Sequence, residues 1–103
     1  MIDGLVSGRI FGDPEQRRGK GDSPFVVAKL RAPTQDTETV LVNVIAFDDA
    51  AMSALLALRD GDAAALAGGL TPKVWTDKQG NARPALDMVA LRVLTVAGQP
   101  IDE

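Results

Sequence analysis

The sequence predicts a small all-β domain of five strands, with one helix between the third and the fourth strand. With 103 residues, the chain has the length of one ordinary domain. Its apolar residues fall mostly in short runs rich in Val, Ile, Leu and Ala that are bounded by Gly, Pro and Asp, which is typical of strands. Only residues 50–58 change to the spacing of an amphipathic helix.

The first two strands are predicted on either side of a polar segment. Residues 1–11 mix large apolar residues with Gly4 and Gly8, which suits a bent strand. Residues 12–24 hold three glycines, two prolines and three basic side chains, and they predict a mobile surface loop. In residues 25–31 the side chains alternate, so that Lys29 and Arg31 share one face. This strand therefore has a half-exposed surface.

The remaining elements follow from similar signals. A turn at residues 33–38 leads to a strand at 39–47 that is apolar on both faces, which indicates the centre of the sheet or an interface. Asp48 or Asp49 is the expected N-cap of the helix, and Gly61 the expected stop. A strand at 62–70 and a hairpin of 73–76 with 83–96 complete a domain over residues 1–97, before a polar end at 98–103. This order is that of an OB-fold barrel, although the pattern alone also permits other small α+β sheets.

The composition excludes several classes of function. Without Cys or His, the chain can form no disulfides, no thiol or His nucleophile and none of the usual zinc or iron sites. A carboxylate site for a hard cation stays open, but no motif supports one, so we expect no metal, no cofactor and no enzyme activity. No apolar run is long enough to cross a membrane and the N-terminus lacks a secretory pattern, so a cytoplasmic protein is expected.

Trp75 is the most informative single residue. It lies in the predicted hairpin among Lys73, Lys78 and, beyond the turn, Arg83. An aromatic ring among cations suits single-stranded nucleic acid, because bases stack on the ring while the cations meet phosphates. The alternative is a core or interface Trp surrounded by solvated charges, and the local sequence favours neither.

Other candidate residues have simpler alternatives. Phe47 ends the central strand, and Phe11 and Phe25 lie in the first two; all three suit a core. A basic cluster in the polar loop could follow a phosphate chain, although such clusters are usually solvated, and Lys29 with Arg31 would point the same way from one strand face. The members of that cluster are Arg17, Arg18 and Lys20.

The net charge of −3 argues against a uniformly basic nucleic-acid binder, but the charges are segregated. Residues 48–70 carry one basic and four acidic side chains, whereas residues 71–96 carry four basic and two acidic ones. A positive surface on an acidic molecule is therefore compatible with the sequence.

Four motifs in order along the chain resemble those of bacterial single-stranded DNA-binding proteins (SSB). Residues 8–17 (GRIFGDPEQR) are similar to the family's G…DPE-x-R loop, and residues 44–47 (VIAF) to its VVxF motif before the helix. Residues 73–83 (KVWTDKQGNAR) resemble its KWTD-x-x-G-x-x-R hairpin, which is the most specific of the matches. Residues 87–90 (DMVA) resemble the strand that follows.

The resemblance implies an OB-fold homodimer or homotetramer that binds single-stranded DNA, with little sequence preference, in replication, recombination or repair. Phe47 and Trp75 would stack on bases, and the phosphate contacts would come from Arg17, Lys73, Lys78 and Arg83. The family's long basic hairpin is here the short turn at 33–38, and Leu41 stands where a stacking Trp is common. No acidic tail of the kind that recruits replication proteins follows, so we expect a short, tailless variant with a small site.

The sequence leaves two alternatives to this interpretation open. A short primosomal replication protein has the same fold and is a neighbouring family. An OB-fold module that mediates protein assembly, with little or no affinity for DNA, is the competing class of function. The net acidity and the scarcity of aromatic residues favour that module, and the Trp75 hairpin opposes it.

Overall fold

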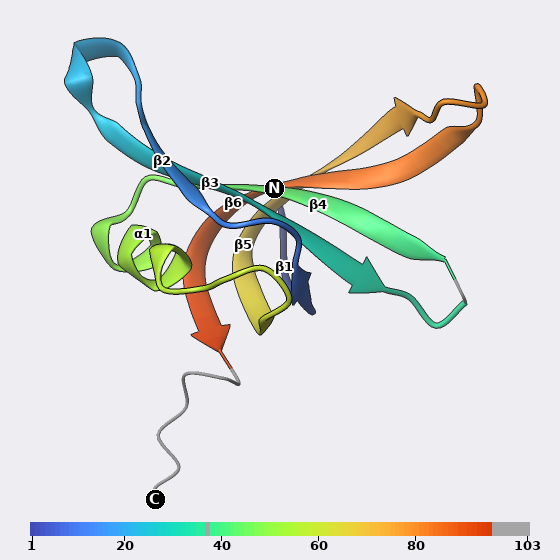
Figure 1. Ribbon diagram of the computed structural model, residues 1–103, viewed down its shortest axis with the longest axis horizontal. Helices are drawn as coiled ribbons and strands as arrows, with labels where there is room; N and C mark the ends of the chain where they lie inside the picture. Colours follow the sequence, from blue (N-terminus) through green and yellow to red (C-terminus); the bar gives the residue numbers. More distant parts are fainter. Residues whose placement is uncertain (37, 96–103) are drawn as a thin grey trace, which may run out of the picture.

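The computed structural model describes residues 1–36 and 38–95, so residues 96–103, which include the predicted polar end at 98–103, lie outside the described residues. Strands dominate the fold (Figure 1). In chain order they are β1 (Ile2–Ile10), β2 (Glu15–Arg18), β3 (Pro24–Pro33), β4 (Thr39–Ala46), β5 (Ala63–Thr76) and β6 (Ala82–Thr95). The helical elements are a single 3-10 turn η1 (Lys20–Asp22) and the helix α1 (Asp49–Leu56).

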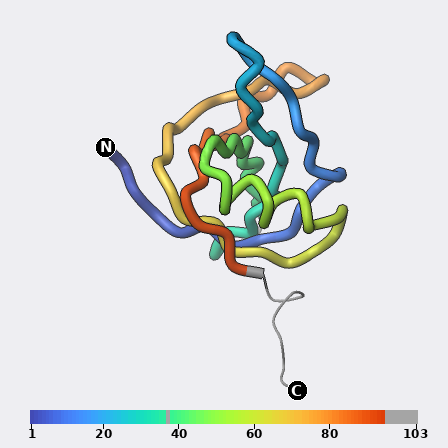
Figure 2. Tube along the Cα trace, turned by 90° about the vertical axis from the view of Figure 1, so that its left-hand side faces the viewer, coloured from blue at the N-terminus to red at the C-terminus, as the bar shows by residue number. Residues whose placement is uncertain are grey.

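The sheet closes on itself in a ring. Its order is β1-β5-β6-β4-β3-β2, and a short pairing of Arg9 with Arg31 and Ile10 with Leu30 joins β1 back to β3. All neighbours are antiparallel except β4 and β6, which run parallel. The helix α1 packs against β6 and β3, near one end of the ring (Figures 1 and 2). The all-β prediction with one helix is therefore confirmed.

Alternate residues of the strands fill the inside of the ring, as the period of two requires. In β3 and β4 the inward side chains are fully or almost fully buried, and Leu55 of α1 closes the core from outside the sheet. The inward residues of these two strands are Val26, Ala28, Leu30, Ala32, Val42, Val44 and Ala46. Because one parity is buried, the other parity of each strand is fixed on the outer surface of the ring.

The boundaries of the helix follow its capping. The Asp48 carboxylate accepts hydrogen bonds from the backbone N–H groups of Ala50 and Ala51, each at 3.1 Å, so Asp48 rather than Asp49 is the N-cap. The helix ends at Leu56, two residues before the predicted end. Its position between the third predicted strand and the fourth corresponds to the segment between β4 and β5.

Two strand predictions need correction. Part of the expected loop at 12–24 is the strand β2, which pairs with Pro24–Val27 of β3 and is exposed along its whole length. A strand with no buried face has no apolar alternation, so the hydrophobic pattern does not reveal it. The predicted segments 62–70 and 73–76 are one continuous strand, β5, with a bulge at Ala67/Gly68.

Close packing of the backbone requires glycine at two positions of the ring. A Cβ atom on Gly8 would lie 2.0 Å from the carbonyl oxygen of Arg31, and one on Gly68 would lie 1.9 Å from that of Val89. Neither distance is possible for a real side chain, so these glycines let neighbouring strands approach where the ring curves.

Candidate nucleic-acid interface

The outer surface of β3, β4, β6 and β5 forms one continuous face. Strand register places Val27, Ile45 and Val89 in one row across the sheet. The next row contains Lys29, Asn43 and Asp87. A groove of about 860 Å³ follows these rows, and Arg17 lines it as well. The groove therefore has an apolar row beside a charged one, so that a base could contact the apolar row while its phosphate contacts the charged row.

Exposed aromatic rings border this face where β3 and β4 meet α1. Phe47 is 58 % exposed, so it is not the core residue that its apolar neighbourhood allowed. Its ring lies 6.2 Å from that of the half-buried Phe25, at 45°. Arg17 of β2 is the cross-strand partner of Phe25, which places a guanidinium group beside the aromatic pair.

Trp75 lies on the hairpin arm formed by the ends of β5 and β6, which projects from the ring in Figure 1. It pairs in register with Arg83 and is 44 % exposed, so a core position is excluded. A cavity of about 530 Å³ separates it from the ring, and Phe11 and Arg31 line that cavity too. The single tryptophan thus borders a cavity within the described residues.

Most cations of this face are held by carboxylates. Arg17 Nη2 lies 3.2 Å from Glu15 Oε1, and Lys73 Nζ lies 3.8 Å from Asp87 Oδ2. All of these side chains are about half exposed, and exposed pairs of this kind stabilise a fold by ~0–1 kcal/mol each. A phosphate can therefore replace either carboxylate at small cost.

Arg83 is held by two carboxylates, Glu38 Oε2 at 3.6 Å and Asp77 Oδ2 at 3.0 Å. By contrast, Lys29 and Arg31 form no salt bridge with any residue of the described ranges 1–36 and 38–95. These two are the cations most directly available to a phosphate.

Asp77 organises the turn of the Trp75 hairpin. Its carboxylate accepts hydrogen bonds from the backbone N–H of Asn81 at 2.9 Å, from that of Gln79 at 3.0 Å and from Arg83 Nε at 3.0 Å. The bond from Asn81, followed by those from Arg83 and Gln79, holds the pKa of Asp77 below its ordinary value of 3.8, against the opposing effect of burial.

The turn is therefore expected to loosen in acid. A depressed pKa means that the ionised carboxylate stabilises the fold fully above pH 3.8, and that this contribution is lost as the pH falls through the lower pKa of the folded state. Urea unfolding at pH 7 should show Asp77→Asn less stable than the wild type, and the difference should shrink toward pH 2. A difference that stayed constant over this range would show that the charge of Asp77 is irrelevant to the turn.

The structure brings seven of the predicted site residues onto the outer face and its arms: Arg17, Lys29, Arg31, Phe47, Lys73, Trp75 and Arg83. Three others lie apart from the groove. Arg18 donates to the carbonyl of Asp22 at 3.0 Å within the β2–β3 arm, where Lys20 lies in the 3-10 turn. Lys78 lies in the turn at the tip of the Trp75 hairpin.

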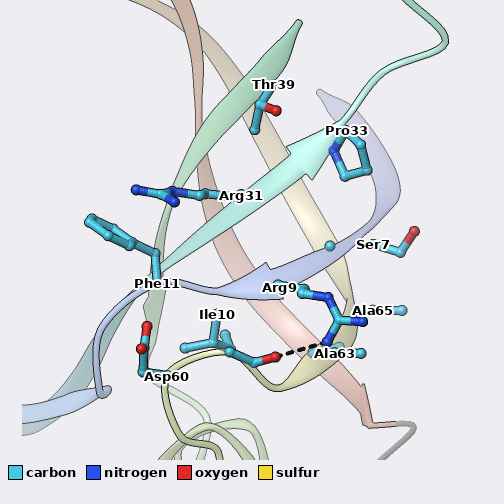
Figure 3. Close-up of a pocket in the computed structure, with 13 residues that line it drawn as sticks. Ser7, Arg9, Ile10, Phe11, Arg31, Pro33, Thr39, Asp60, Ala63 and Ala65 are labelled. Atoms are coloured by element: carbon cyan, nitrogen blue, oxygen red, sulfur yellow. Dashed lines mark hydrogen bonds between the residues drawn. The ribbon is translucent and has the colours of Figure 1, made fainter. Parts of the chain in front are cut away.

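Phe11 is the residue that sequence reasoning misplaced. The sequence predicts it in the core, but Phe11 is 43 % exposed, and the guanidinium carbon of Arg31 lies 3.9 Å from the centre of its ring. Figure 3 shows the two side chains projecting together from the junction of β1 and β3. The alternation of side chains along β1 gives the direction of Phe11: because Ile10 faces inward, the next residue faces outward.

Two further properties of the described residues concern metal-binding clusters and membrane-spanning helices. Among residues 1–36 and 38–95, no three acidic, His or Cys side chains gather where they could hold a metal ion. Over the same ranges, no helix has the length and apolar character that crossing a membrane requires.

Comparison of the sequence with protein-family models gives no match, and comparison with curated proteins gives no significant one. Solved structures, in contrast, match over nearly the whole chain. A small single-stranded DNA-binding protein of Streptomyces coelicolor superposes with a TM-score of 0.70 at 21 % identity, over 93 % of this chain and 95 % of that one.

Two eukaryotic structures match equally widely. The mitochondrial single-stranded DNA-binding protein Rim1 of S. cerevisiae has a TM-score of 0.68 at 14 % identity, covering 92 % of this chain and 94 % of that one. The Plasmodium falciparum SSB, solved in complex with single-stranded DNA, has a TM-score of 0.68 at 13 % identity, covering 93 % and 95 %. The closed sheet, its single helix and these superpositions together show that the chain has the OB fold of single-stranded DNA-binding proteins.

Proposed function

We propose that this protein binds single-stranded DNA without catalysis and with little sequence preference, as a cytoplasmic component of replication, recombination or repair. One observation carries the proposal: exposed aromatic rings and five cations share the outer face of a single sheet. The structural neighbours support it, because all three are single-stranded DNA-binding proteins.

Binding would combine stacking with phosphate contacts. Phe47 and Trp75 offer exposed ring faces, and stacking on such rings contributes ~1–3 kcal/mol per base. Lys29 and Arg31 would meet phosphates first, because they have no carboxylate to give up within the described residues. Arg17, Lys73 and Arg83 would each exchange a carboxylate for a phosphate, and these phosphate contacts make the affinity sensitive to salt.

Titration of Trp75 fluorescence with oligo-dT tests the proposal, because the chain contains a single tryptophan. Emission should be quenched at low salt, and the logarithm of the binding constant should fall with the logarithm of the salt concentration. If all five cations meet phosphates, the slope should be about −3.5. An absence of binding, or binding indifferent to salt, would favour the alternative of an OB-fold module for protein assembly.

We also propose self-association, as a homodimer or homotetramer, through β1. Strand β3 pairs with β1 only at Arg9 and Ile10 and approaches it closely at Gly8, so within the described residues no strand pairs with residues 2–7 along the edge that faces away from β5. An unpaired edge of this length is a template for a second copy.

The side chains around that edge suit burial against a second copy. Leu5 is exposed and pairs in register with Ala67, and the exposed Leu94 pairs with Ala65 two residues along β5. Sedimentation equilibrium at micromolar concentration should give a dimer or tetramer, and Leu5→Lys should shift it toward monomer. A wild type that sediments as a monomer would refute the proposed interface.

A further inference from the structure

The cavity beside Trp75 is lined by further residues, among them Phe11 and Glu38, that the proposed stacking and phosphate contacts do not use. Its volume of about 530 Å³ lies in the range of ligand pockets. It is lined by two aromatic rings from distant parts of the chain, Phe11 after β1 and Trp75 near the end of β5. Each ring is a little under half exposed, so each keeps a free surface.

Phe11 is held in place by its surroundings. Its backbone N–H donates to the carbonyl of Lys29 at 2.9 Å, which fixes the chain at the end of β1. The Arg31 guanidinium covers the ring with its carbon 3.9 Å from the ring centre. A guanidinium over an aromatic ring forms one layered planar surface, and planar surfaces of this kind stack on nucleobases.

Apart from Leu41, the remaining lining of the cavity is polar and carries both signs of charge. Glu38 and Arg83 lie side by side, with Oε2 and Nη1 3.6 Å apart, and Thr39 adds a hydroxyl group. A carboxylate can accept two neighbouring N–H groups at once, and guanine is the one base of the four that offers two such donors side by side on one edge, with an acceptor next to them. Guanine carries acceptors at O6 and N7 and donors at N1 and N2.

We propose that this cavity binds one nucleobase of a single strand and prefers guanine. The base would stack on Trp75 and on the Phe11–Arg31 layer. The Glu38 carboxylate would accept hydrogen bonds from N1–H and N2–H of guanine, and the Arg83 guanidinium would donate to O6 or N7. Thymine, cytosine and adenine each lack part of this set, so they enter the cavity with weaker polar contacts. The inference rests on the proposed function and adds a base preference to it.

The experiment compares two labelled oligonucleotides, dT15 and dT15 with guanine at its central position. Fluorescence anisotropy measures both affinities without depending on tryptophan emission. The wild type should bind the guanine strand about tenfold more tightly. A strand with adenine at the same position should bind no more tightly than dT15.

Two variants locate the preference in the cavity. Phe11→Leu keeps an apolar side chain of similar size, and Glu38→Gln keeps the shape of the side chain but removes its charge. Each should reduce the tenfold preference to about onefold. Phe47→Leu is the matched control, because it removes an aromatic ring at the other end of the face: it should weaken both strands equally and leave the preference intact.

The outcomes separate the two proposals. Salt-sensitive binding of both strands with equal affinity would overturn the base preference and leave the proposed function standing. A preference that survives in Phe11→Leu and Glu38→Gln would place guanine recognition elsewhere and would also overturn the inference. If neither strand binds at all, the proposed function fails and the inference fails with it.

Discussion

The Trp75→Ala variant is expected to bind oligo-dT roughly 5- to 150-fold more weakly than the wild type, which corresponds to the ~1–3 kcal/mol that one stacked base contributes. The fold should survive, because Trp75 lies on a projecting arm and is 44 % exposed. Affinity is measured by anisotropy of a labelled strand, since this variant has no tryptophan. Far-UV circular dichroism and urea unfolding establish that the variant is folded.

Val74→Ala is the matched control for this prediction. Val74 is adjacent on the same arm and 72 % exposed, but its side chain lies on the opposite face of β5. It should leave affinity within about twofold of the wild type. Equal affinities for Trp75→Ala and the wild type would contradict a stacking role, and unfolding of Trp75→Ala would make the residue structural.

Gly68→Ala is expected to destabilise the fold by ~3 kcal/mol or more, a large share of the stability of a domain of this size. The added methyl group would lie 1.9 Å from the carbonyl oxygen of Val89, and only movement of the β5 or β6 backbone can relieve that contact. Urea unfolding followed by circular dichroism measures the loss.

The adjacent Gly69→Ala provides a strict comparison. Its nearest neighbour would be the Met1 Sδ atom at 3.6 Å, an ordinary contact at the end of a flexible side chain. This variant should therefore change the free energy of unfolding by less than ~1 kcal/mol. If the two variants lost similar free energies of unfolding, the close approach of β5 and β6 at Gly68 would not be the reason that glycine is required there.

The elements with one buried face were predictable from the sequence, and those without one were not. Strands β3 and β4 alternate buried and exposed residues, and their boundaries fall within about two residues of the expected ones. The strand β2 has no buried residue, and only its pairing with β3 defines it. The period of apolar residues cannot report such a strand, because that period arises from burial.

The candidate site shows the same division. Trp75 and its neighbouring cations are close in sequence, so a local motif could propose them. The cavity, in contrast, depends on Phe11 meeting Arg31 across the β1–β3 closure and on β5 bringing Trp75 to the same place. Such a meeting follows from ring closure, which no local pattern encodes. The parity of β1 does carry the direction of Phe11, once Ile10 is known to face inward.

The carboxylates that pair with Arg17, Lys73 and Arg83 have a kinetic consequence for the proposed complex. Each is tethered beside its cation, so it acts as a competitor at high effective concentration. When a phosphate leaves one of these cations, the neighbouring carboxylate competes with it for the cation. A bound DNA strand would then lose its phosphate contacts one at a time, and its residence time on the protein would be short.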